Sequence, residues 1–110
     1  MAGESYLDNK GFFCKGKYDK FRAFWCEDSV CSEYIISGYK IETKPSPFEY
    51  KLIGTDTIEF SIGGFFNKTR LNRKTLMMGK YFQCEVTSTK MDVMKPLEEI
   101  IDEAKNNNKI

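Results

Sequence analysis

The sequence predicts a mainly β fold, a small antiparallel meander barrel or sandwich of about seven to eight strands with one C-terminal α-helix. Aromatic residues favour strands, and they make up 15% of the 110 residues. Short aromatic and β-branched segments recur along the chain, separated by turn residues. Helical periodicity is confined to the C-terminal part of the chain.

The turns and the alternation of side chains define the expected strands. Pro45 and Pro47 keep their segment out of a central strand, because proline donates no hydrogen bond to a sheet. In Thr57–Ile62, apolar and polar residues alternate, which predicts one buried and one solvated face. The Gly63-Gly64 pair indicates a break or bulge. The expected strands are 11–15, 21–26, 32–37, 39–42, 50–53, 57–62, 69–78 and 81–86, of which 69–78 is either one bent strand or two.

The C-terminal part predicts a helix over residues 92–105. Leu97, Ile100, Ile101 and Ala104 follow helical spacing and form one apolar stripe, which we expect to pack on the barrel or across its open end. Asp92 or a nearby residue is the expected N-cap. The whole chain, 1–110, is then a single domain, with a flexible segment at 1–10, a β-barrel at 11–86 and a frayed tail at 106–110.

The bulk composition excludes several classes of function. The net charge is +1, so no nucleic-acid partner is expected, and no apolar run reaches the length of a membrane span. The chain contains no histidine, which removes the commonest general base and most catalytic zinc sites. No catalytic constellation is recognisable, so we expect a protein that is not an enzyme and needs no cofactor.

Four cysteines, Cys14, Cys26, Cys31 and Cys84, are the most informative residues. In so short a chain, they favour disulfides over free buried thiols and over a zinc site. Cys14 and Cys84 lie in the first and last expected strands, which become neighbours in a closed meander, and Cys26 and Cys31 would then form the second pair. A pairing of Cys14 with Cys26 across the first hairpin is the rival.

Two surfaces are candidates for binding. The segment around Lys68, Arg70, Arg73 and Lys74 is strongly basic, and such a hairpin can hold a phosphate, a carboxylate or an acidic partner; the alternative is a solvated strand face. Adjacent aromatic pairs such as Phe65-Phe66 must point to opposite faces if they lie in strands, so some aromatic residues lie outside the core, against the helix, a partner or a ligand.

Both ends of the barrel segment carry a resemblance. The stretches 12–16 (FFCKG) and 81–84 (YFQC) resemble small periplasmic proteins of the membrane-bound c-type lysozyme inhibitor type. The segment 71–76 (LNRKTL), followed by 81–84, is similar to small uncharacterised proteins of marine bacteria and phages. The resemblance implies a compact antiparallel barrel that carries both cysteine strands. The stretch 44–50 does not match the Ser- and Gly-rich inhibitory loop of that family, and no inhibitory residue is transferred.

These observations lead to a functional hypothesis. We expect a non-catalytic binding module that recognises a protein or an envelope component. The N-terminus lacks the apolar segment of a signal peptide, so the chain is either cytoplasmic with reduced thiols or exported with its signal removed, and the cysteine content favours export to the periplasm or beyond. The alternatives are a cytoplasmic phage or bacterial accessory protein that self-associates, and a lysozyme-inhibitor-like protein.

Overall fold

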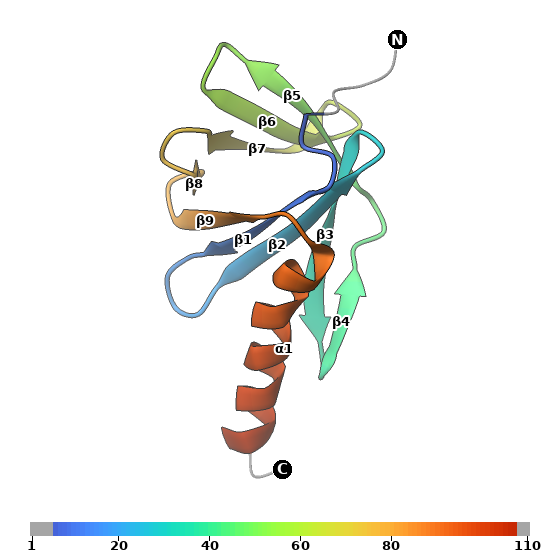
Figure 1. The fold of residues 1–110 in the computed structure, drawn as a ribbon, viewed down its shortest axis with the longest axis vertical. Coiled ribbons are helices and arrows are strands. Elements are labelled where there is room, and N and C mark those ends of the chain that lie inside the picture. The colour runs from blue at the N-terminus through green and yellow to red at the C-terminus, as the bar shows by residue number, and fades with distance from the viewer. Residues whose placement is uncertain (1–5, 108–110) are drawn as a thin grey trace.

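The computed structural model describes residues 6–107, which form nine strands and one helix (Figure 1). The elements are β1 (Lys10–Lys15), β2 (Phe21–Glu27), β3 (Val30–Ser37), β4 (Lys40–Thr43), β5 (Phe48–Ile53), β6 (Thr57–Ile62), β7 (Phe66–Asn72), β8 (Met77–Met78), β9 (Phe82–Thr87) and α1 (Lys90–Asn107).

Eight of these strands close an antiparallel barrel in the order β2-β1-β9-β8-β7-β6-β5-β3, with β3 pairing back to β2. The predicted fold class is therefore confirmed. The ninth strand, β4, lies outside this closed ring. It pairs with residues 34–37 of β3, whereas β5 pairs with Val30 and Cys31 at the other end of the same strand edge. The β3–β4 hairpin projects from the barrel beside α1 (Figure 1).

Side chains alternate between the barrel interior and the outer surface. Phe12 and Phe24 point inward and belong to the same buried cluster as Phe60. Their neighbours Phe13 and Trp25 point outward and are buried beneath the helix. The prediction that adjacent aromatic residues serve opposite faces is thus confirmed for two strands, and the helix covers much of the outward-facing set.

The helix packs on the outer face of the barrel, over β1 and β2, through Val93, Leu97 and Ile101. It begins at Lys90 and not at Asp92, because the Oγ1 of Thr89 caps it by accepting a hydrogen bond from the Asp92 N–H at 3.2 Å. The helix continues to Asn107, so residues 106 and 107 are helical and do not belong to the frayed tail predicted for 106–110. Residues 108–110 lie outside the described range.

Residues 6–9 form an ordered turn that fills one end of the barrel, so the prediction of a flexible segment at 1–10 is wrong for this part; residues 1–5 lie outside the described range. Leu7 is buried, and its N–H donates to the hydroxyl of Tyr50 at 3.3 Å. That hydroxyl donates to the Oδ1 of Asp8 at 3.0 Å, and the Ser29 N–H donates to the same oxygen. Burial, followed by these contacts with Asp8, raises the pKa of Tyr50 to about 12.

One open alternative is decided, and one further expectation needs correction. The 69–78 segment forms two strands and not one bent strand, because a turn separates β7 from β8, with Leu76 in the left-handed region at φ 60°. The outer face of β6 is not fully solvated. Glu59 points outward but is only 3% exposed, since Lys51 and Arg70 on the flanking strands cover it and pair with its carboxylate.

The cysteines form two cross-strand disulfides inside the barrel, Cys14–Cys84 and Cys26–Cys31. Both pairs occupy directly opposed positions in their strand pairs, β1–β9 and β2–β3. The first bond joins the first strand to the last. All four sulfurs are oxidised, which leaves no thiolate for a zinc ion. Two such bonds indicate an oxidising, extracytoplasmic environment.

Candidate functional site

The two ends of the barrel differ. The turn formed by residues 6–9 fills the end where β1 begins. At the opposite end, where β2, β5 and β7 begin and β6 ends, the structure has a cavity of about 560 Å³. Three cationic residues line it, and the described residues of its lining include no carboxylate. The lining residues are Arg22, Lys44, Pro45, Ser46, Phe48, Ile62, Asn67, Lys68 and Thr69.

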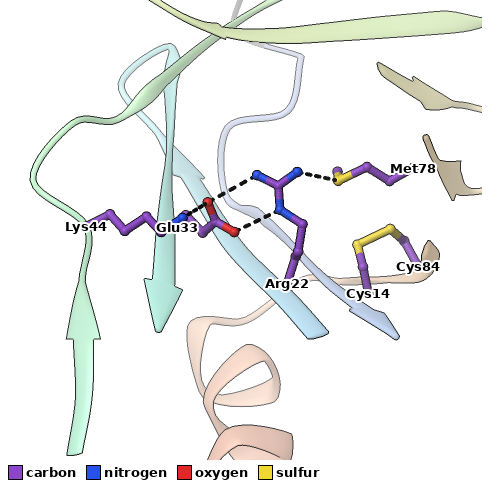
Figure 2. Close-up of polar contacts among 6 residues, drawn as sticks. All are labelled: Cys14, Arg22, Glu33, Lys44, Met78 and Cys84. Carbon is purple, nitrogen blue, oxygen red and sulfur yellow. Dashed lines mark hydrogen bonds and ion pairs between the residues drawn. A yellow bond between two sulfur atoms is a disulfide. The ribbon is translucent and has the colours of Figure 1, made fainter. Parts of the chain in front are cut away.

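The inner part of the cavity is held by an ion pair (Figure 2). Arg22 lies at the start of β2, and its Nε and Nη2 donate to both carboxylate oxygens of Glu33 at 2.9 and 3.1 Å. The Nζ of Lys44 donates to Glu33 from the other side at 2.9 Å. The Nη1 of Arg22 points to the sulfur of Met78 at 3.9 Å, which is a weak acceptor. The guanidinium also lies 5.0 Å from the centre of the Phe24 ring.

Glu33 is ionised at neutral pH. Burial acts to raise the pKa of its carboxyl, but the hydrogen bonds and the charges of Arg22 and Lys44 outweigh burial and hold the pKa below its ordinary value. The carboxylate thereby neutralises one of the three cations around the cavity and fixes the guanidinium in place. The Lys44 side chain is 42% exposed and the Arg22 side chain 22%, so both cations also reach solvent.

The third cation, Lys68, lies at the start of β7, directly after an exposed aromatic turn. No carboxylate within residues 6–107 pairs with it. Phe65 and Phe66, in this turn and at the first position of β7, are 80% and 70% exposed. Gly64 and Asn67 flank them with φ values of 80° and 53°, which turn the chain sharply between β6 and β7. We call residues 63–68 the aromatic loop; Asn67 and Lys68 of this loop line the cavity.

The basic residues predicted from the sequence do not form one surface. Lys68 is at the beginning of β7, whereas Arg73 and Lys74 follow its end. The Nε of Arg70 pairs with Glu59 at 3.2 Å, and the Nζ of Lys74 lies 3.5 Å from a carboxylate oxygen of Asp56. Arg73 donates to the carbonyl oxygen of Thr55 and lies over the ring of Tyr6. Of the four cations, Lys68 alone lines the cavity.

Sequence reasoning missed Arg22, Glu33 and Lys44. The alternation of side chains along a strand could have identified Arg22 and Glu33. Cys26 points into the barrel, and Arg22 is four residues before it in the same strand, so both lie on one face. Glu33 lies two residues after Cys31 in β3, so it also points into the barrel. Lys44 follows the end of β4, and no periodicity in the sequence predicts its approach to Glu33.

A second concavity, of about 470 Å³, lies between α1 and the β1–β2 hairpin. Its lining combines two lysines with three carboxylates, so its charges largely cancel. Within residues 6–107, no group of His, Cys, Asp and Glu side chains is arranged to hold a metal ion, and no helix combines the length and apolarity needed to cross a bilayer. The cavity at the open end is therefore the better candidate.

Comparison of the chain with family models, with curated proteins and with solved structures finds no match. The barrel implied by the resemblance to lysozyme inhibitors is present, but membership of that family has no support from these comparisons. The function must therefore be argued from the site itself.

Proposed function

We propose that this protein is a non-catalytic binding module of the periplasm or the extracellular space, and that it engages its partner with the open end of the barrel. One observation carries the proposal: the open end of the barrel combines a cationic cavity with exposed aromatic rings. A cavity with three cations lies beside the aromatic loop, in which two adjacent phenylalanines are almost fully exposed.

Exposed aromatic rings are costly when no partner covers them. Exposed apolar patches on small proteins mark interaction sites, since water contact with large aromatic rings is unfavourable. Phe65 lies in the turn between β6 and β7, and Phe66 follows it at the first position of β7. Neither ring belongs to the buried core. Aromatic residues and arginine are enriched at the centres of protein interfaces, and Arg22 lines the adjacent cavity.

The experiment is capture of partners from an extract of the envelope and the secreted fraction of the source cells, analysed by mass spectrometry. Wild-type protein is compared with Phe65→Ser/Phe66→Ser. Because the aromatic loop is exposed, the variant should fold normally and lose the captured partner. A partner captured equally by both proteins would contradict the proposal.

A matched control variant tests the basic surface that the sequence suggests. Arg70→Glu/Arg73→Glu changes two cations away from the cavity. We expect this variant to retain the partner, whereas its loss together with retention by Phe65→Ser/Phe66→Ser would move the contact surface to the side of the barrel. Light scattering across protein concentration tests self-association through the aromatic loop, the alternative in which the partner is a second copy.

A further inference from the structure

We propose that the cavity at the open end binds a phosphate group through Arg22, Lys44 and Lys68. This inference rests on the proposed function, because it names the chemistry recognised by the same site. The phosphate of an anionic lipid headgroup and that of a soluble phosphate ester present the same chemistry to these three cations.

Charge is the first argument. One buried carboxylate, Glu33, pairs with two of the three cations that line the cavity, and no described carboxylate pairs with the third, so the lining is net positive. A phosphate group carries between one and two negative charges near pH 7 and matches this excess. The cationic excess is local, since the whole chain has a net charge of only +1.

The arrangement of the donors is the second argument. Among the described residues, the Nη1 of Arg22 has one hydrogen-bond partner, the thioether sulfur of Met78 at 3.9 Å, which is a weak acceptor. Lys44 reaches the cavity from the segment between β4 and β5, and Lys68 from the start of β7. Cationic residues from three segments thus line one cavity, which suits an anion that offers several acceptor oxygens.

Preorganisation is the third argument. Glu33 is 3% exposed, and it holds the guanidinium by two hydrogen bonds and the ammonium of Lys44 by a third. The two cations are therefore positioned before any ligand arrives, which lowers the cost of ordering side chains on binding. Ser46 and Thr69 add hydroxyl groups to the same lining.

The test has a soluble arm and a membrane arm. In the first, sodium pyrophosphate is titrated into the oxidised protein, and binding is followed by calorimetry and by amide chemical shifts. In the second, the protein is co-sedimented with vesicles of phosphatidylglycerol and, separately, of phosphatidylcholine. Binding of pyrophosphate with shifts at Arg22, Lys44 and Lys68 supports a soluble ligand. Binding to phosphatidylglycerol alone, with loss in Phe65→Ser/Phe66→Ser, supports a lipid.

The decisive variant is Lys68→Gln, because this residue makes no ion pair within the described chain and its change should not disturb folding. We expect it to weaken binding about tenfold, the effect of one charge-assisted hydrogen bond. Lys51→Gln is the charge control, since it removes the same charge from the outer face of the barrel, where Lys51 lies 3.8 Å from Glu59. The affinity of this variant should stay within about twofold of wild type. Arg22→Gln should abolish binding, but it also leaves Glu33 without its main partner, so Lys68→Gln keeps the test decisive.

Two results would overturn the inference. One is the absence of binding in both arms, and the other is an equal loss of affinity in Lys68→Gln and Lys51→Gln, which would show a general charge effect. If either occurs while partner capture still depends on Phe65 and Phe66, the phosphate inference fails and the proposed binding function stands.

Discussion

Two carboxylates in this barrel are almost equally buried, and they allow a matched experiment. The side chains of Glu33 and Glu59 are both 4% exposed, and each is paired with two cations. They differ in their arginine partners. The Arg22 side chain is 22% exposed and makes two hydrogen bonds to Glu33, whereas the Arg70 side chain is 63% exposed and makes one to Glu59 at 3.2 Å.

We expect Arg22→Met to be far more destabilising than Arg70→Met. Breaking a buried ion pair costs about 3–5 kcal/mol, because the remaining charge is left buried without its partner. Lys44 still holds Glu33 at 2.9 Å, so the expected loss for Arg22→Met is near the lower end, about 3 kcal/mol. In the second site only the carboxylate is buried, since the Arg70 side chain is largely exposed, and Lys51 still lies 3.8 Å from Glu59, so the expected loss for Arg70→Met is smaller, about 1 kcal/mol.

The assay is urea unfolding of the oxidised proteins at pH 7, with the free energy of unfolding extrapolated to water. The double variant Arg22→Met/Glu33→Leu adds a second check. It removes both charges together and should recover most of the loss, since no buried charge remains. A loss in Arg22→Met no larger than that in Arg70→Met would refute the view that Glu33 depends on the guanidinium.

Three further predictions follow from single contacts. Cys14→Ala/Cys84→Ala opens a loop with a sequence separation of 70 and should lower the free energy of unfolding by about 4 kcal/mol. An unchanged midpoint in urea titrations would contradict a disulfide that joins the first strand to the last. Gly11→Ala places a methyl group against the Cγ2 of Val93, so it should displace α1 and cost about 1–3 kcal/mol, visible as a lower thermal midpoint. A wild-type midpoint would show that the helix does not lie so close. The pKa of Glu33 is lowered in the folded protein, so the stabilisation that its carboxylate gives is complete above the unfolded pKa near 4.5 and is lost as the pH falls through the folded pKa. The free energy of unfolding, measured from pH 7 to pH 2, should therefore fall less steeply in Glu33→Gln than in wild type.

Much of the fold could be predicted because local rules determine it. Alternation in Thr57–Ile62 and the spacing of Leu97 and Ile101 predict a strand and a helix that the structure contains. The pairing of Cys14 with Cys84 followed from placing these residues in the first and last strands of a closed meander. These features depend on periodicity and chain order, which a sequence displays directly.

The remaining features depend on contacts between distant segments. Glu59 is buried because long side chains on the two flanking strands cover it, which alternation alone cannot indicate. Leu7 is fixed by the hydroxyl of Tyr50, a residue 43 positions away. Lys44 meets Glu33 because β4 and β5 share one edge of β3, an arrangement that follows from strand order and not from composition.

The oxidation state of the cysteines is the central claim, because the covalent link between the first and last strands and the extracytoplasmic environment both depend on it. The most direct measurement is the intact mass of the protein isolated from its source cells with thiols trapped by an alkylating agent under denaturing conditions, before and after reduction. Two disulfides predict no alkylation before reduction and a mass about four hydrogens below that of the reduced chain. Alkylation of all four cysteines before reduction would contradict the account and favour a cytoplasmic protein.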